Sequence, residues 1–197
     1  FPYVKGVMIS GSLSKGIMKK GGDIDYFIVT SPGRLWICRT LLILFKKVFL
    51  LNSRKFFCLN HFIDADHLEI RDQNIFTATE IVTAKPVYNR QLYWEFLHQN
   101  QWVSTYYPQH QQQNTDRTNP SRTGILKPLA EKLLDGKLGE KLDNWCMQRT
   151  ATYWQQKFNT ADPEADNASH QTDKHLSKQN DFDFQTYVLE QYQQKVS

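Results

Sequence analysis

Residues 7–30 read VMISGSLSKGIMKKGGDIDYFIVT, and this stretch decides the fold. Within it, the small-residue turn at 11–16 and the acidic triplet at 23–25 are each flanked by apolar residues. Apolar runs on either side of a glycine turn indicate two strands joined by a short connector. We therefore predict strands at 3–10 and 23–30.

The triplet Asp23-Ile24-Asp25 places two aspartates on the second strand. Because side chains alternate faces along a strand, Asp23 and Asp25 point the same way, while Ile24 points to the core. Two carboxylates this close repel each other unless a cation lies between them, and Mg²⁺ is held by carboxylates together with substrate phosphates. We therefore predict Asp23 and Asp25 as metal ligands, with two solvated acids in a turn as the alternative.

The turn before the triplet carries the groups that a phosphate needs. Gly11 lets the backbone approach a ligand closely, Ser12 and Ser14 bring hydroxyls, and Lys15 brings a cation. Backbone N–H groups in such a turn form an anion-binding concavity. The spacing of a P-loop is absent. These four residues are the predicted phosphate site, with ordinary turn residues as the alternative.

The order of these motifs resembles the signature of the DNA polymerase beta-type nucleotidyltransferase superfamily. It consists of a Gly-Ser pair at 11–12, ten intervening residues and an Asp-x-Asp motif at 23–25. The turn GSLSKG at 11–16 is also similar to the Gly-Ser-x-Ala-Arg-Gly turn of its small bacterial members. The resemblance covers about residues 3–90. It implies transfer of a nucleoside monophosphate from a nucleoside triphosphate to an acceptor hydroxyl or phosphate, with release of pyrophosphate. The acceptor is not indicated.

The same resemblance implies roles for individual residues. Asp23 and Asp25 would hold Mg²⁺ or Mn²⁺, as two ions that stabilise the attacking and leaving oxygens. The Gly11-Ser12 turn and Lys15 would hold the β- and γ-phosphates of the triphosphate.

Catalytic members of the superfamily usually add a third carboxylate from a later strand. The matching strand here is predicted at 55–63, and its central polar residue is Asn60. An amide oxygen binds Mg²⁺ without bringing charge, and asparagine is a poor general base. Asn60 is therefore a predicted metal ligand that departs from the family pattern. Asp64 and Asp66, just past the strand, are the alternatives.

Other polar residues near this region have plainer interpretations. His61 is expected on the opposite strand face from Asn60, as a core or surface histidine. Glu80 lies in the helix predicted at 74–84, and Lys85 directly follows it. Both side chains are expected to be solvated.

The rest of the chain predicts helices. Residues 35–51 are apolar on nearly every side, as in a helix that packs on a sheet and is covered again. A helix at 74–84 stops before Pro86, and a short one follows at 90–98. The fold class is α/β, a small mixed sheet flanked by helices and followed by a helical C-terminal region.

The chain is expected to have three parts. The resemblance implies a nucleotidyltransferase-like domain at residues 1–98, and composition predicts an exposed, polar, Gln-rich linker at residues 99–121. Residues 122–197 are the helical C-terminal region, in which Gly136 and Gly139 split one long helical pattern. A terminal helix is predicted near residues 184–196.

Overall composition limits the partners. The net charge of +4 permits binding of a polyphosphate or nucleic acid but does not argue for nucleic acid. Three widely spaced cysteines make neither a zinc pattern nor a disulfide framework, which favours the cytoplasm. The most apolar segment, at 36–51, carries three cations and is shorter than the roughly 20 residues of a membrane span, so no membrane partner is expected. The chain enters a strand within a few residues of a first residue that is not Met, which favours a fragment of a longer protein.

Three classes of function follow from these patterns. The first is a metal-dependent nucleotidyltransferase that uses a nucleoside triphosphate. The alternative is a catalytically weak or inactive module that binds Mg²⁺-nucleotide and acts as a regulator. A scaffold or nucleic-acid-binding protein is a third class, which no basic run supports.

Overall fold

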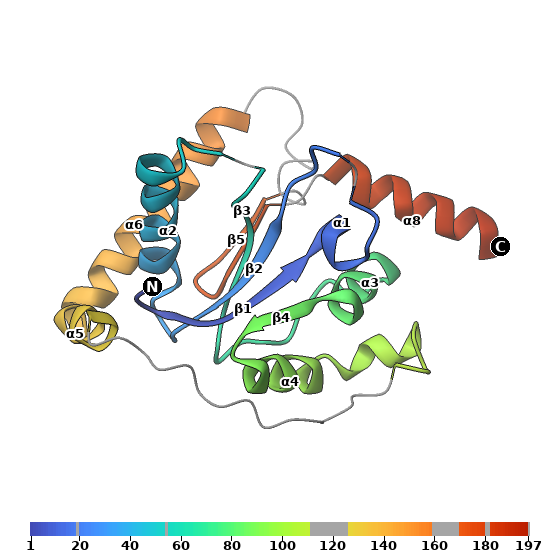
Figure 1. Ribbon diagram of the computed structural model, residues 1–197, viewed down its shortest axis with the longest axis horizontal. Helices are drawn as coiled ribbons and strands as arrows, with labels where there is room; N and C mark the ends of the chain where they lie inside the picture. The colour runs from blue at the N-terminus through green and yellow to red at the C-terminus, as the bar shows by residue number, and fades with distance from the viewer. Residues whose placement is uncertain (19, 54, 111–125, 159–169, 180–181, 197) are drawn as a thin grey trace.

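The computed structural model describes residues 1–18, 20–53, 55–110, 126–158, 170–179 and 182–196. Its described strands form one mixed sheet in the order β4-β1-β2-β3-β6-β5 (Figure 1). Strands β2 and β3 are parallel, and the other neighbours are antiparallel. The predicted α/β class is confirmed. The strands are β1 (Val4–Ser10), β2 (Asp25–Thr30), β3 (Cys58–Asp64), β4 (Lys85–Tyr88), β5 (His170–Thr172) and β6 (Leu176–Gln179).

Helices flank this sheet, and most begin and end close to their predicted positions. Asn74 accepts a hydrogen bond from the N–H of Thr77 at the start of α3, which is a side-chain N-cap. Gly136, with φ +83°, separates α5 from α6, whereas Gly139 lies inside α6. The helices are α1 (Gly11–Ser14), α2 (Leu35–Phe49), α3 (Ile75–Thr83), α4 (Arg90–Gln99), the 3-10 helix η1 (Gln101–Thr105), α5 (Leu126–Leu133), α6 (Lys137–Phe158) and α8 (Phe182–Val196).

The sheet separates two hydrophobic cores. Because side chains alternate along β2, Phe27 belongs to one core and Ile28 to the other. The first core packs against α3 and α4, and the second against α2 and α6, which lie on opposite sides of the sheet in Figure 1. Several residues of the first core also line the cavity described below, among them Ile81 from α3 and Phe96 from α4.

Helix α2 is buried over its first half only. Leu35 and Trp36 are fully buried, but Val48 is exposed and Phe49 is 69% exposed. The prediction of a helix covered on every side is therefore correct for the first half and wrong for the second. The cover is α6, whose Asp143 accepts a hydrogen bond from the Ile37 N–H at 2.8 Å in the first turn of α2.

Sequence reasoning missed three strands and one packed segment. β4 contains Pro86 and was expected only as the end of a helix; an edge strand tolerates proline because one side of its backbone is unpaired. The β5–β6 hairpin extends the sheet beyond β3, where only helices were expected. Local composition did not reveal β4 and β6, because their partners β1 and β3 are distant in sequence, and β5 pairs only with β6.

The first part of the Gln-rich segment at 99–121 packs on the domain. Val103 in η1 is buried, and Trp102, Tyr106 and Tyr107 pack against the first core. Residues 99–110 thus differ from the exposed segment that the sequence predicts. The remaining residues, 111–121, lie outside the described residues.

We expect Asp143→Asn to stabilise the protein at pH 7. Burial raises the pKa of Asp143 to about 6, above its unfolded value near 4, although hydrogen bonds from the backbone of Ile37 and Trp36 act in the opposite direction. Between pH 4 and 6 the folded protein binds a proton at Asp143 that the unfolded chain has already lost. The free energy of unfolding therefore falls as pH rises from about 4 to 6. Asparagine keeps the acceptor oxygen without the charge.

The expected gain for Asp143→Asn is about 2–3 kcal/mol above pH 6. Denaturant unfolding of both proteins between pH 4 and 8 tests this. The difference in unfolding free energy should grow from pH 4 to 6 and then level off. A difference that does not change with pH would contradict the raised pKa of Asp143 in the folded state.

Candidate functional site

A cavity of about 490 Å³ lies over the first core, where β1 ends and β2 begins. Five of the seven predicted phosphate and metal residues line it, namely Gly11, Ser12, Lys15, Asp25 and, from β3, Asn60. Ser14 and Asp23 are absent from its described lining. The structure therefore brings together most, but not all, of the residues that the sequence singles out.

Gly11 and Asp25 are in direct contact. They adjoin because Ser10, at the end of β1, pairs with Asp25, at the start of β2. Gly11 has φ +67°, and a Cβ built there would lie 2.2 Å from the Asp25 carboxylate. Glycine is thus required twice, for the backbone conformation and for the space that the carboxylate occupies.

The predicted strand alternation of the two aspartates is wrong. β2 begins at Asp25, and Asp23 lies in the segment before it, so the two carboxylates are not alternate residues of one strand. Asp23 nevertheless lies close enough for its charge to raise the pKa of Asp25. The pair remains electrostatically coupled without sharing a strand face.

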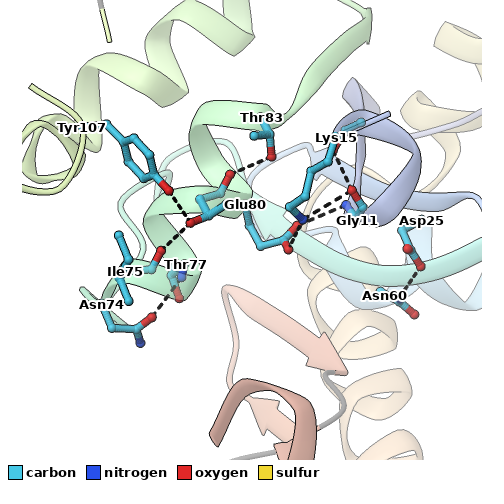
Figure 2. Close-up of polar contacts among 12 residues, drawn as sticks. Gly11, Lys15, Asp25, Asn60, Asn74, Ile75, Thr77, Glu80, Thr83 and Tyr107 are labelled. Carbon is cyan, nitrogen blue, oxygen red and sulfur yellow. Dashed lines mark hydrogen bonds and ion pairs between the residues drawn. The ribbon is translucent and has the colours of Figure 1, made fainter. Parts of the chain in front are cut away.

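Asn60 contacts Asp25 directly. Its amide nitrogen donates to the Asp25 carboxylate at 2.6 Å (Figure 2). Its amide oxygen accepts from the thiol of Cys58 at 3.1 Å. Oxygen and nitrogen of an amide are assigned from such partners, and a half-turn of the amide would present the oxygen to a cation beside Asp25. Asn60 therefore occupies the place expected of a third ligand, as a neutral one.

A register shift in β3 explains why Asn60 and His61 are both in the cavity. Tyr26 pairs with Leu59, but Phe27 pairs with His61, so Asn60 is an extra residue between two pairs. A bulge of this kind disturbs the alternation of faces. The expectation that His61 lies opposite Asn60 is therefore wrong, because both side chains line the cavity.

Glu80, from α3, binds two groups of the turn at residues 11–15. One of its carboxylate oxygens accepts the Gly11 N–H at 3.1 Å, and the other pairs with the ammonium group of Lys15 (Figure 2). Lys15 also donates to the Gly11 carbonyl at 3.3 Å. The expected solvated position of Glu80 is wrong, whereas Lys85 is exposed as expected.

Ser14 supports the turn from inside. Its side chain is buried, and its hydroxyl donates to the Gly11 carbonyl at 2.9 Å. Ser12 lines the cavity instead. Of the two serines in the predicted phosphate site, Ser12 is therefore the one in the cavity lining.

The electrostatics favour a cation beside Asp25. Burial raises the pKa of the Asp25 carboxyl, and the charges of Asp23 and Glu80 raise it further, while the charge of Lys15 lowers it. Asp25 thus lies near two further carboxylates, Asp23 and Glu80, and near the ammonium group of Lys15, which Glu80 already pairs. Oxygen ligands of this charge suit Mg²⁺ or Mn²⁺. The donor set therefore fits the divalent cation that the sequence predicts.

Two neighbouring groups are held in their uncharged forms. Burial, together with the charges of Asp25 and Asp23, raises the pKa of the Cys58 thiol to about 11, so the thiol is protonated at neutral pH. Burial, together with the charge of Lys178, lowers the pKa of His61 to about 3, so the imidazole is neutral. Neither group supplies an ionic ligand to this site at neutral pH.

Asp64 lies at the other end of β3 from the site. It pairs with Thr30, whereas Asp25 pairs with Cys58. Its carboxylate accepts the N–H groups of Gly33 and Asp66, both at 2.9 Å. With His67 and His175, Asp64 forms a separate cluster whose ligand atoms lie within 4.8 Å of one another.

Comparison of the chain with protein-family models, with curated proteins and with solved structures found no match. In the part of the chain that the structure describes, each helix is too short or too polar to cross a membrane.

Proposed function

We propose that this protein is a metal-dependent nucleotidyltransferase. One observation carries the proposal: a single cavity is lined both by a partly buried carboxylate, Asp25, and by three residues of the glycine turn, Gly11, Ser12 and Lys15. The turn already holds an anion, the carboxylate of Glu80, through a backbone N–H and an ammonium group. A triphosphate offers the same turn more negative charge, and its metal ion would be bound next to it by Asp25.

In the proposed reaction, an acceptor hydroxyl oxygen forms a bond to the α-phosphorus of the triphosphate. The bond from that phosphorus to the bridging oxygen breaks, its electron pair leaves with pyrophosphate, and the hydroxyl proton passes to solvent water. Asp25, Asp23 and Asn60 would hold two Mg²⁺ or Mn²⁺ ions, which supply charge stabilisation to the attacking and leaving oxygens. The Gly11 N–H, the Ser12 hydroxyl and Lys15 orient the β- and γ-phosphates.

Binding requires the phosphates to displace Glu80 from the turn. The Glu80 carboxylate and a phosphate oxygen compete for the Gly11 N–H and for the ammonium group of Lys15. Glu80 therefore occupies the donors of the turn, and phosphate binding must break the ion pair between Glu80 and Lys15.

A second candidate is a regulatory module that binds Mg²⁺-nucleotide without turnover. Asn60 favours it, because the side chain that β3 directs at Asp25 is neutral and brings neither charge nor a base. This candidate shares the binding step and lacks pyrophosphate release.

Calorimetry with ATP tests the shared step. We expect at least about tenfold tighter binding in Mg²⁺ than in EDTA, because the triphosphate and the site's carboxylates repel each other without a cation. Asp25→Asn should abolish the difference, whereas Asp66→Asn, at an exposed position, should preserve it. Equal affinity of the wild type in Mg²⁺ and EDTA would contradict both candidates. Pyrophosphate release with cell lysate as the acceptor source then separates the two candidates.

A further inference from the structure

The cavity continues from the polar site into an apolar chamber, which the proposed reaction leaves unused. We define the apolar chamber by Phe27, His61, Phe76, Phe96, Phe184 and Val188. It lies between the sheet and α3 on one side and α8 on the other. The whole cavity, about 490 Å³, has the size of a small-molecule site.

His61 is the one polar group in this set, and its ring orientation is held. The imidazole stacks on Phe27 with ring centroids 4.2 Å apart and an interplanar angle of 12°. Phe27 in turn packs against Phe96 at 5.1 Å. The Nε2 atom of His61 is buried and has no hydrogen-bond partner among the described residues.

An unmet hydrogen bond at a buried atom is costly, which favours a ligand that completes it. The β3 bulge places this imidazole directly beside Asn60, so a molecule bound to His61 lies next to the Asp25 site. That is where an acceptor must present its oxygen to the α-phosphorus.

The residues that line the apolar chamber indicate the polarity and charge of a ligand that would fit it. Phe184 of α8 packs edge-to-face on Phe76 of α3, with centroids 6.0 Å apart. Lys178 also lines the cavity, but Asp72 pairs with it at 2.7 Å. Within the described lining, both lysines are paired with acids, so the chamber offers apolar surface rather than an unpaired cation.

We propose that the apolar chamber binds the acceptor, an uncharged small molecule with a ring-bearing apolar body and a hydroxyl, through a hydrogen bond to His61. This inference rests on the proposed function. It excludes an acceptor that is itself a polyanion, because such a molecule would lose its hydration against apolar walls without gaining a cation.

The test uses 2-naphthol, a fluorescent hydroxyl compound, titrated into the full chain. We expect saturable binding that persists in saturating Mg²⁺ and inorganic tripolyphosphate. Val188→Trp fills the apolar chamber and should weaken binding at least about tenfold. Val196→Trp is the matched control, the same substitution on the same helix at a position that is 67% exposed and outside the cavity lining.

A second variant separates the hydrogen bond from the packing. His61→Phe keeps a ring on Phe27 but removes Nε2, so it should weaken 2-naphthol about fivefold or more and leave naphthalene nearly unchanged. Equal effects on both compounds would overturn the role of His61.

Two further results would overturn the proposal. The first is unchanged 2-naphthol binding in Val188→Trp. The second is displacement of 2-naphthol by Mg²⁺-ATP but not by Mg²⁺-tripolyphosphate, because the nucleobase rather than the acceptor would then fill the chamber. Failure of ATP to bind in a metal-dependent way would instead contradict the proposed function, since 2-naphthol binding is also measured without ATP.

Discussion

Asn60→Asp is expected to lower the melting temperature in EDTA by about 5–10 °C at pH 7, and Mg²⁺ should restore most of the loss. In the wild type, the Asn60 amide donates to the Asp25 carboxylate at 2.6 Å. Aspartate removes the donor and places a like charge there. A lost hydrogen bond to a charged group costs about 1.5–3 kcal/mol, and each kcal/mol is worth about 2–4 °C in a chain of this size.

The same substitution should make stability depend on pH and on metal. Two adjoining carboxyls raise one folded pKa above its unfolded value, so the penalty grows as pH rises and shrinks when they share a proton near pH 4–5. A divalent cation relieves the repulsion and stabilises the folded state by about 2.7 kcal/mol at one hundred times its dissociation constant. If the site is catalytic, pyrophosphate release should also rise.

Thermal unfolding in EDTA, Mg²⁺ and Mn²⁺ at pH 5 and 7 measures these effects. Asn144→Asp provides the matched control, because that residue is exposed on α6. The same Mg²⁺ response in the Asn60 variant and in the wild type would remove Asn60 from the candidate metal site.

Glu80→Gln is the second change with a large expected effect: the affinity for Mg²⁺-tripolyphosphate and Mg²⁺-ATP should rise about tenfold or more. Glu80 occupies the Gly11 N–H and the ammonium group of Lys15, and both groups must be released before a phosphate can bind. Glutamine fills the same volume but forms no ion pair. A tenfold change in affinity corresponds to about 1.4 kcal/mol, near the lower end of the range for a charged hydrogen bond. The lower end applies because both side chains are partly exposed to water.

The variant should also unfold at a slightly lower temperature without ligand, since one ion pair is lost. Glu95→Gln is the control, an exposed residue on α4. The opposite result, weaker Mg²⁺-dependent binding in Glu80→Gln, would show that Glu80 holds the metal ion rather than the resting turn. Calorimetry with tripolyphosphate in Mg²⁺ and in EDTA distinguishes the two roles.

Several elements could be predicted because the information for them is local. The apolar runs around the glycine turn predict β1 and β2, and the residues expected at helix ends, such as Asn74 and Gly136, lie where the helices begin and end. The contact of Gly11 with Asp25 also follows from the turn, because it joins adjacent antiparallel strands. Periodicity and turn chemistry act within a few residues, so one chain displays them directly.

Other features depend on partners that are distant in sequence. The bulge that places Asn60 and His61 side by side is a property of the β2–β3 pairing, and strict alternation predicts the opposite. Glu80 is separated from Lys15 by 65 residues, and its helical context alone favours solvent. β6 is a strand because β3 has an edge to pair with, not because its own residues are apolar.

The sequence by itself determined the α/β class and the glycine turn, and it predicted two acids, Asp23 and Asp25, of which the structure places Asp25 in the cavity lining. The tertiary structure decided which groups meet that acid: Asn60 through a bulge, Glu80 through the docking of α3, and the apolar chamber through α8. The physical reason is the range of the interactions. Backbone conformation and side-chain alternation are set by neighbours along the chain, whereas a carboxylate's partners are set by which surfaces must pack together to bury apolar area.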